Sequence, residues 1–307
     1  MVKNLKEKIV NVYDKHYKLF MFISLTILLL SFVQIGYQTY TTGSFINKGI
    51  SLKGGVSFTV LDTDYNVKQL QKDLTDLYPK NEFEISAISS LGEQKGIVVS
   101  ADISDNDKVL EESMNKDIAR ITGSGDITIK RMGSSLAEGF FREIVLCMLV
   151  GFVFMSIVVF MLFKTFAPSA AVILSGITDI IVPIAITNLM GIKISTAGIA
   201  AFLMLIGYSV DTDIVLTTRL VKNKDGTPIE RTLSAFKTGI MMTTTSIAAV
   251  AIGLMMSSSE VLREIFTILL IGLIVDIPST WIQNVGILRI YLEHEDKKKA
   301  HKHEKQV

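Results

Sequence analysis

The sequence predicts a polytopic α-helical membrane protein that has six transmembrane helices and an α+β domain between the first and second of them. The mean hydropathy of the 307 residues is +0.43, which is high for a soluble domain. The apolar residues come in six blocks of about 20 or more, the length that crosses a hydrocarbon core of roughly 30 Å. Residues 38–142, between the first two blocks, instead show the mixed pattern of a soluble domain.

The first apolar block, 18–37, is longer than the apolar core of a secretory signal peptide, and no small-residue cleavage site follows it. We therefore expect this block to stay in the protein as transmembrane helix 1. The other five helices are expected within 143–290, at 143–163, 168–190, 194–217, 238–257 and 264–288.

Lysine and arginine residues predict the orientation, because short cytoplasmic segments are enriched in them. They gather in the segment 1–17, in the loop 219–237 and in the tail 291–307, which fall on one side of a six-helix arrangement. Both termini are therefore predicted to be cytoplasmic, and the domain 38–142 extracytoplasmic, in a protein of the cytoplasmic (plasma) membrane. The basic tail either attracts anionic membrane lipid or is a solvated flank. The chain has no charge pattern that indicates binding of nucleic acid.

The domain 38–142 alternates between strand and helix patterns. β-Branched and aromatic runs predict strands at 56–61, 83–88, 96–100 and 126–132, and helical spacing of apolar residues predicts helices at 67–77 and 110–121. The order βαββαβ is that of a ferredoxin-like plait, in which both helices cover one face of the sheet. The other face is free to contact an extended polypeptide or to be buried against a partner subunit. Gly54 and Gly55, just before the sheet, suggest a hinge.

The composition argues against an enzyme. The domain contains no histidine, no Ser/His/Asp or Cys/His set and no phosphate-binding loop, so we expect no catalytic site and no cofactor. Cys147 is the only cysteine, so no intramolecular disulfide bond can form. The histidines His294, His301 and His303 are interpreted as part of a solvated tail, and no metal site is expected.

Two acidic residues, Asp211 and Asp213, lie in the fourth predicted helix. A charge at membrane depth costs roughly 2.5 to 3.5 kcal/mol on insertion scales, so an acid there is a functional candidate. The two side chains point about 200° apart on a helix, so they cannot share one face. Asp211 shares its stripe with Gly207, which would let another helix approach, and is predicted to face the interior. Asp213 is expected to face a second seam or the headgroups, where Arg219 could pair with it.

Acids also lie in the middle of the third and sixth predicted helices, at Asp179 and Asp276. A proline follows each of them, Pro183 and Pro278, and should kink the helix and expose polar backbone beside the acid. The alternative is a kink that serves packing alone. The fifth helix contributes Lys237 and a run of small and hydroxyl residues, which suit close helix packing or a relay of protons.

These residues are expected to take up and release protons. A proton that crosses a potential of about 150 mV releases roughly 3.5 kcal/mol, which can drive a conformational change. The proton-coupling candidates are Asp211, Asp213, Asp179, Asp276 and Lys237.

With these parts, the chain resembles the SecF family of Sec protein-export membrane proteins in its archaeal form, and through it the RND transporter superfamily. Its membrane part would then be one six-helix, RND-like half. The resemblance rests on the string Gly207, Tyr208, Ser209, Val210, Asp211, Thr212 and Asp213, on Gly54 and Gly55 in the segment 49–55, and on Asp276, Thr280, Trp281 and Asn284.

The resemblance implies an accessory subunit of the Sec translocase. Such a subunit would pair with SecD, bind the SecY-type channel complex and promote export of a translocating polypeptide, using the proton gradient. The bacterial members of the family have an acid at the position where Thr212 stands in this chain. Asp211 instead matches, by its chemistry, the acid in a VDAN segment of SecD. Lys237 takes the place of a bacterial arginine in the fifth helix.

Two other functions compete with this interpretation. An RND-type proton-driven exporter of small molecules or lipids is the alternative, although one six-helix half would need a partner. An intramembrane aspartyl protease that uses Asp179 and Asp211 would need a glycine before its second acid, where Val210 stands. A rhomboid-like serine protease is disfavoured because every histidine lies outside the predicted helices.

Overall fold

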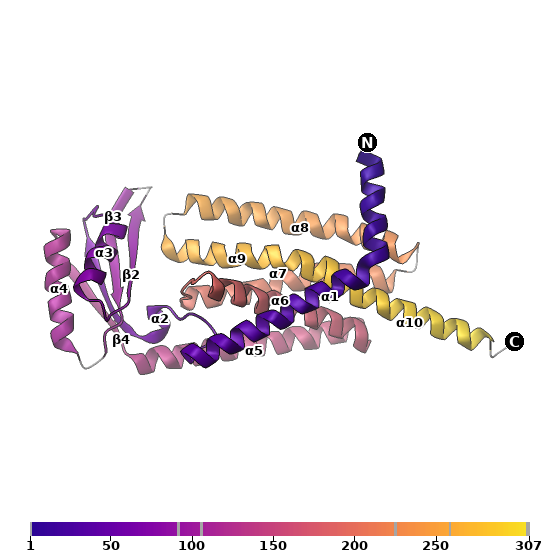
Figure 1. Cartoon of the computed structure of the whole chain (residues 1–307), viewed down its shortest axis with the longest axis horizontal. Coiled ribbons are helices and arrows are strands. Elements are labelled where there is room, and N and C mark those ends of the chain that lie inside the picture. The colour runs from indigo at the N-terminus through magenta and orange to yellow at the C-terminus, as the bar shows by residue number, and fades with distance from the viewer. Residues whose placement is uncertain (1, 91–92, 105–106, 224–225, 258, 305–307) are drawn as a thin grey trace.

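The computed structural model describes residues 2–90, 93–104, 107–223, 226–257 and 259–304. An α/β domain lies at one end of an elongated helical bundle, and both chain termini lie at the other end (Figure 1). Of the tail predicted at 291–307, the last residues, 305–307, lie outside the described residues.

Six helices of the described chain are long and apolar enough to cross a membrane, as predicted, which supports a multi-pass membrane protein. Most of them are longer than the apolar blocks because they continue into flanking sequence, whereas α6 nearly coincides with its block. The first five are α1 (Val2–Thr42), α5 (Ser134–Phe163), α6 (Phe166–Leu189), α7 (Thr196–Thr217), which continues into η1 (Thr218–Lys222), and α8 (Pro228–Met256). The sixth consists of α9 (Glu260–Pro278), the π-helical turn η2 (Ser279–Asn284) and α10 (Val285–Glu304).

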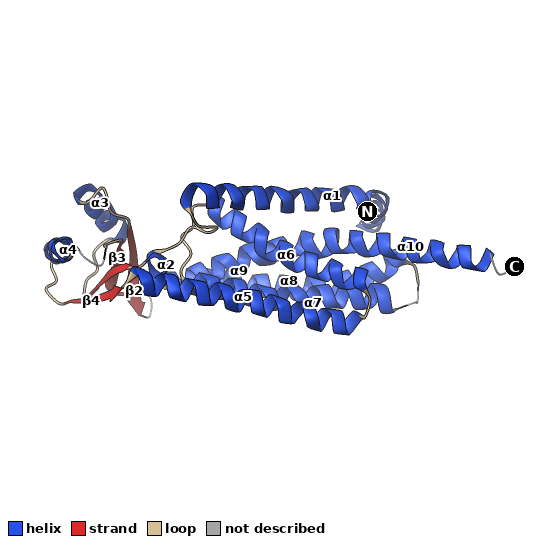
Figure 2. Cartoon of the chain, turned by 90° about the horizontal axis from the view of Figure 1, so that it is seen from below, coloured by secondary structure: helices blue, strands red, loops and turns tan. Residues whose placement is uncertain are grey.

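The helices α6 and α7 lie at the centre of the bundle, whereas α5 and α8 lie at its outside. In the most apolar windows of α6 and α7, 61% and 56% of the residues are buried, against 6% for α5 and 11% for α8. Figure 2 shows α1 and α5 on opposite sides, with α6 between them. Polar side chains on α6 and α7 can therefore be shielded from lipid, while α5 and α8 leave broad faces uncovered.

The α/β domain has the predicted order βαββαβ. Its sheet has the order β2-β3-β1-β4 with antiparallel neighbours. Phe58 of β1 is fully buried with Leu70 and Met114 from the two helices, so both helices pack on one face. The other face points towards the bundle in both views (Figures 1 and 2). The elements are β1 (Gly55–Leu61), α3 (Val67–Leu77), β2 (Phe83–Ser90), β3 (Glu93–Ala101), α4 (Lys108–Thr122) and β4 (Ile127–Met132), preceded by the short helix α2 (Ile50–Lys53).

The glycines before the sheet do not form the expected hinge. Gly54 has φ +89°, and a Cβ on it would lie 2.6 Å from Cα of Ser134 at the start of α5. A Cβ on Gly55 would lie 2.4 Å from the carbonyl oxygen of Ala101 in β3. Glycine is required at both positions because backbones approach closely there, which fixes this end of the domain to α5.

Candidate functional site

The buried stripe of α7 carries Asp213 and not Asp211. Asp213 is 0% exposed, and its Oδ1 accepts a hydrogen bond of 2.7 Å from Nδ2 of Asn284. Asp211 is exposed, so the prediction that it faces the interior is wrong. The prediction assumed that another helix approaches Gly207, but among the described residues no atom lies within 4 Å of the place that a Cβ would take there. Asp213 is also not paired with Arg219, whose guanidinium donates to a serine of α8 instead.

The other two acids lie beside Asp213. Asp179 on α6 and Asp276 on α9 are each 1% exposed and are close enough to Asp213 to interact with it electrostatically. Ser209, one turn before Asp213, donates a hydrogen bond to Oδ2 of Asp179. The Thr280 hydroxyl donates one of 3.2 Å to Oδ1 of Asp276. These acids from three helices form one group, the carboxyl cluster (Asp179, Asp213 and Asp276).

The π-helical turn η2 directs the polar side of the last span towards the carboxyl cluster. Pro278 has no amide hydrogen, so the regular α-helical ladder is interrupted there. Residues Ser279–Asn284 then form a wider, π-helical turn, in which backbone hydrogen bonds join residues five apart. Pro183 also lacks an amide hydrogen, but no wider turn follows it, and α6 continues as one α-helix through it. The side chains that η2 buries completely are Thr280, Gln283 and Asn284.

Hydroxyl and amide groups that sequence reasoning missed complete the site. The hydroxyl oxygens of Ser175 and Ser279 lie 2.7 Å apart and join α6 to η2. Nε2 of Gln283 donates to the hydroxyl of Thr178 at 2.9 Å, and its Oε1 accepts from Ser24 of α1 at 3.1 Å. Two of these residues precede the acid of α6 by one turn or less. The sequence signal that could have revealed these two residues is a hydroxyl side chain within about one helical turn of an acid in the middle of a membrane helix.

The carboxyl cluster contains acid oxygens that are buried and, in the described chain, unpaired. Oδ1 of Asp179 and Oδ2 of Asp213 are buried and have no hydrogen-bond partner in the part of the chain that the structure describes. Within the described residues, no lysine, arginine or histidine is paired with the cluster. Three carboxylates without a counter-charge would repel one another strongly in an apolar interior. A protonated carboxyl group is neutral and can donate its hydrogen to a neighbouring carboxylate, so uptake and release of protons is the chemistry that this arrangement supports.

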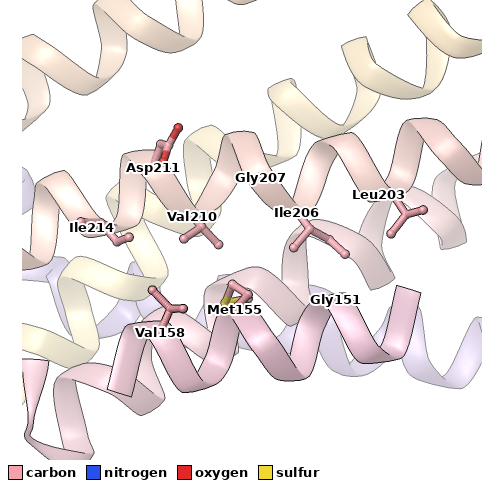
Figure 3. Close-up of a pocket in the computed structure, with 9 residues that line it drawn as sticks. All are labelled: Gly151, Met155, Val158, Leu203, Ile206, Gly207, Val210, Asp211 and Ile214. Carbon is pink, nitrogen blue, oxygen red and sulfur yellow. The ribbon is translucent and has the colours of Figure 1, made fainter. Parts of the chain in front are cut away.

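Asp211 lies between two grooves on the surface of α7. The first, of about 440 Å³, runs between α7 and α5, and Figure 3 shows Ile206 and Val210 directed across it towards Met155, while Asp211 points away from α5. The second groove, of about 260 Å³, is bounded by α7, α8 and α9 and extends from the exposed Asp211 to the buried Asp276. It therefore runs from the bundle surface to one member of the carboxyl cluster, and most of its lining surface is apolar. Hydroxyl groups in its lining come from Tyr208, Thr212, Thr243, Thr245 and Ser246.

The remaining predicted site residues lie apart from the carboxyl cluster. Lys237 is exposed on α8 and, within the described chain, has no hydrogen bond or ion pair. Tyr208 is 47% exposed on the same side of α7 as Asp211. In the described chain, no three His, Cys, Asp or Glu residues are grouped so that they could hold a metal ion.

The sequence is similar to archaeal protein-export membrane proteins. A family model described as "Protein export membrane protein SecD/SecF, C-terminal" matches residues 112–294. The protein-export membrane protein SecF of Methanolacinia petrolearia is 37% identical over 276 residues, which cover 88% of this chain and 92% of that protein. SecF of Pyrococcus furiosus is 34% identical over 253 residues, or 82% of this chain and 83% of that protein.

The fold is also similar to that of SecDF. The crystal structure of SecDF, a translocon-associated membrane protein from Thermus thermophilus, matches 91% of this chain with a TM-score of 0.70 at 20% identity. The match covers 38% of that longer chain. A SecDF structure in a super-membrane-facing form gives a TM-score of 0.63 at 19% identity. The family model and the identity to relatives over most of their length show that this chain belongs to the SecF family of protein-export membrane proteins.

Proposed function

We propose that this chain is an accessory subunit of the Sec protein translocase that pairs with SecD. It promotes export of a translocating polypeptide through a SecY-type channel across the cytoplasmic membrane, coupled to the proton gradient. Membership of the SecF family supports the role in export. The carboxyl cluster is the observation that supports the coupling, because it joins one buried acid from each of α6, α7 and α9.

A change in protonation of the carboxyl cluster would move these helices. Each added negative charge increases the repulsion between acids that no cation offsets, and each added proton allows a new hydrogen bond between them. The groove that leads to Asp276 contains several hydroxyl-bearing residues and supplies a route for the proton from the surface of the bundle. Proton binding is thereby converted into a change of helix packing.

The orientation follows from the two ends of the molecule. The termini and the α/β domain lie at opposite ends of the bundle (Figure 1), and lysine-rich segments adjoin the termini. Cytoplasmic flanks are enriched in lysine and arginine, which supports cytoplasmic termini. The domain 38–142, a ferredoxin-like plait in this proposal, is then outside, where it can contact the emerging polypeptide.

The exposed stripe of α7 is the surface where SecD would pack. Asp211 and Tyr208 are exposed in the middle of a membrane helix, and Asp211 has no partner within the described chain. A carboxyl group facing lipid is costly, so this stripe requires cover by another polar membrane surface. Gly207 lies in the same stripe with open space above it, which suits close approach of a partner helix.

Replacing Gly207 by Trp should therefore expel SecD without unfolding the chain. The indole would fill the open space beside Asp211, since no described atom lies within 4 Å of the Cβ position. SecD and channel subunits are expected to co-purify with the native chain from gently solubilised membranes and to be lost from Gly207→Trp.

Gly36→Trp is the matched control. Gly36 lies in the membrane helix α1 and also has nothing within 4 Å of its Cβ position, so the same bulk is added away from α7. The pairing proposal is wrong if the native chain is recovered as a homo-oligomer without SecD, or if Gly207→Trp retains as much SecD as Gly36→Trp does.

A further inference from the structure

The turn between α6 and α7 is tied by its backbone to the linker that leads from α1 into the α/β domain. The amide of Gly49 donates to the carbonyl oxygen of Ile194 at 2.9 Å, and the amide of Ile194 donates to the carbonyl oxygen of Asn47 at 2.7 Å. Lys48 and Ile194 thus form an isolated parallel β-bridge. Ile194 is 0% exposed, so this pairing is protected from competition by water.

The same turn is held from the membrane side by the helices that carry the carboxyl cluster. Asn188, near the end of α6, accepts from the amide of Asn47 at 3.1 Å and donates to the carbonyl oxygen of Phe45 at 2.9 Å. Ser195, which caps α7, donates from its amide and its hydroxyl to Glu264 of α9, both at 2.7 Å. The ends of α6, α7 and α9 therefore meet the linker at one place, the junction (residues 45–49, 188–195 and Glu264).

Lys193 reaches from the junction to strand β2 of the domain. Its Nζ lies 3.2 Å from Oε2 of Glu82 and 3.8 Å from Oε1 of Glu84. Lys53 of α2 binds the same Glu82 oxygen at 3.0 Å. The hydrogen bonds from Lys53 and then Lys193 lower the pKa of Glu82, against the opposing effect of burial, so this carboxylate is charged at neutral pH.

The backbone pairing and the ion pairs differ in strength. The side chains of Lys193 and Glu82 are 36% and 52% exposed, and ion pairs this exposed form and break readily in water. The buried backbone bonds of the junction are far harder to break. Besides the close packing of Gly54 against the start of α5, the domain is thus joined to the bundle by a firm attachment at the linker and a weak one at β2.

We propose that Lys193 is a positioning residue that latches the α/β domain onto the end of the bundle through Glu82 and Glu84, with the backbone-paired junction as the pivot. A shift of α6 or α7 moves the junction directly, and the latch sets whether the domain follows as one body or tilts about the linker. Salt screens exposed ion pairs, so the latch weakens at high ionic strength while the pivot remains.

The latch can be tested by pulsed electron spin resonance on the full chain in lipid nanodiscs. Spin labels are attached at Val109→Cys on α4 and Met255→Cys on α8, which are 78% and 86% exposed. The background is Cys147→Ser, because Cys147 is the native cysteine and is exposed. The comparison is between Lys193→Ala, Lys193→Arg and Lys53→Ala in this labelled chain.

Lys53→Ala is the matched control because it removes an ion pair to the same Glu82 oxygen without touching the junction. We expect Lys193→Ala to raise the ratio of tilted to latched molecules about two- to fivefold, the range for exposed pairs. The distance distributions of Lys193→Arg and Lys53→Ala should match that of the labelled parent. At a salt concentration of about 1 M, where the Debye length is about 3 Å, the distribution of the parent should broaden but that of Lys193→Ala should not.

An unchanged distance distribution in Lys193→Ala would overturn the latch, and so would equal broadening in Lys53→Ala. The measurement needs neither SecD nor export. A failure of the chain to pair with SecD would therefore contradict the proposed function and leave the result on Lys193 intact.

Discussion

Replacing Asp213 by Asn is expected to abolish gradient-driven export while leaving the protein folded. The amide has nearly the shape of the carboxyl group and can still accept the 2.7 Å hydrogen bond from Asn284, but it cannot take up a proton. The drive lost is roughly 3.5 kcal/mol per proton at about 150 mV, so secretion should fall to the level seen without a gradient. Secretion of signal-bearing proteins, at matched levels of the variant in the membrane, measures this.

Asp211→Asn is the control for that experiment. It removes a carboxyl group two residues away on the same helix, but from the exposed stripe and not from the carboxyl cluster. Its secretion should stay well above that of Asp213→Asn. Normal secretion by Asp213→Asn, or a greater loss in Asp211→Asn, would contradict the assignment of coupling to the buried acids.

Gly239→Ala is expected to be a strongly destabilising small substitution in the bundle. A Cβ on Gly239 of α8 would lie 2.3 Å from the indole of Trp281 and 3.1 Å from Thr212. Trp281 is rigid and 5% exposed, and Phe236 packs against it with ring centroids 5.0 Å apart. Overpacking of this kind costs about 1 to 3 kcal/mol, so thermal unfolding in detergent should occur at a clearly lower temperature.

Gly207→Ala adds the same methyl group where nothing lies within 4 Å. Its unfolding temperature should equal that of the native chain. If Gly239→Ala is equally stable, α8 does not pack against η2 as described, and the groove between α7, α8 and α9 loses its structural basis.

Much of the fold is predictable from local sequence patterns. Six long apolar blocks have few other stable forms than membrane helices, and β-branched and aromatic runs such as 56–61 favour strands. The patterns could not show that Gly54 and Gly55 serve close packing instead of a hinge, because a glycine needed for space and a glycine needed for motion look alike in a sequence. Only the position of Ser134 beside Gly54 decides between them.

The candidate site was predicted by residue type but not by geometry. Asp179, Asp213 and Asp276 were all recognised as acids at membrane depth, yet their meeting depends on how three helices are rotated. In a soluble helix the polar side marks the surface, but a membrane helix can be apolar on both sides, so the pattern around Asp211 and Asp213 did not reveal the buried face. The π-helical turn after Pro278 also rotates the side chains that follow it. A sequence interpreted as a regular α-helix does not predict that rotation.

Proton uptake by proteoliposomes tests most directly whether the carboxyl cluster carries the coupling. Vesicles that contain this chain with SecD, and a pH-sensitive dye inside, are given an imposed gradient. The native pair and the pair with Asp211→Asn should both conduct protons, and the pair with Asp213→Asn should conduct no more than empty vesicles. Equal proton flux through Asp213→Asn and the native chain would contradict the account.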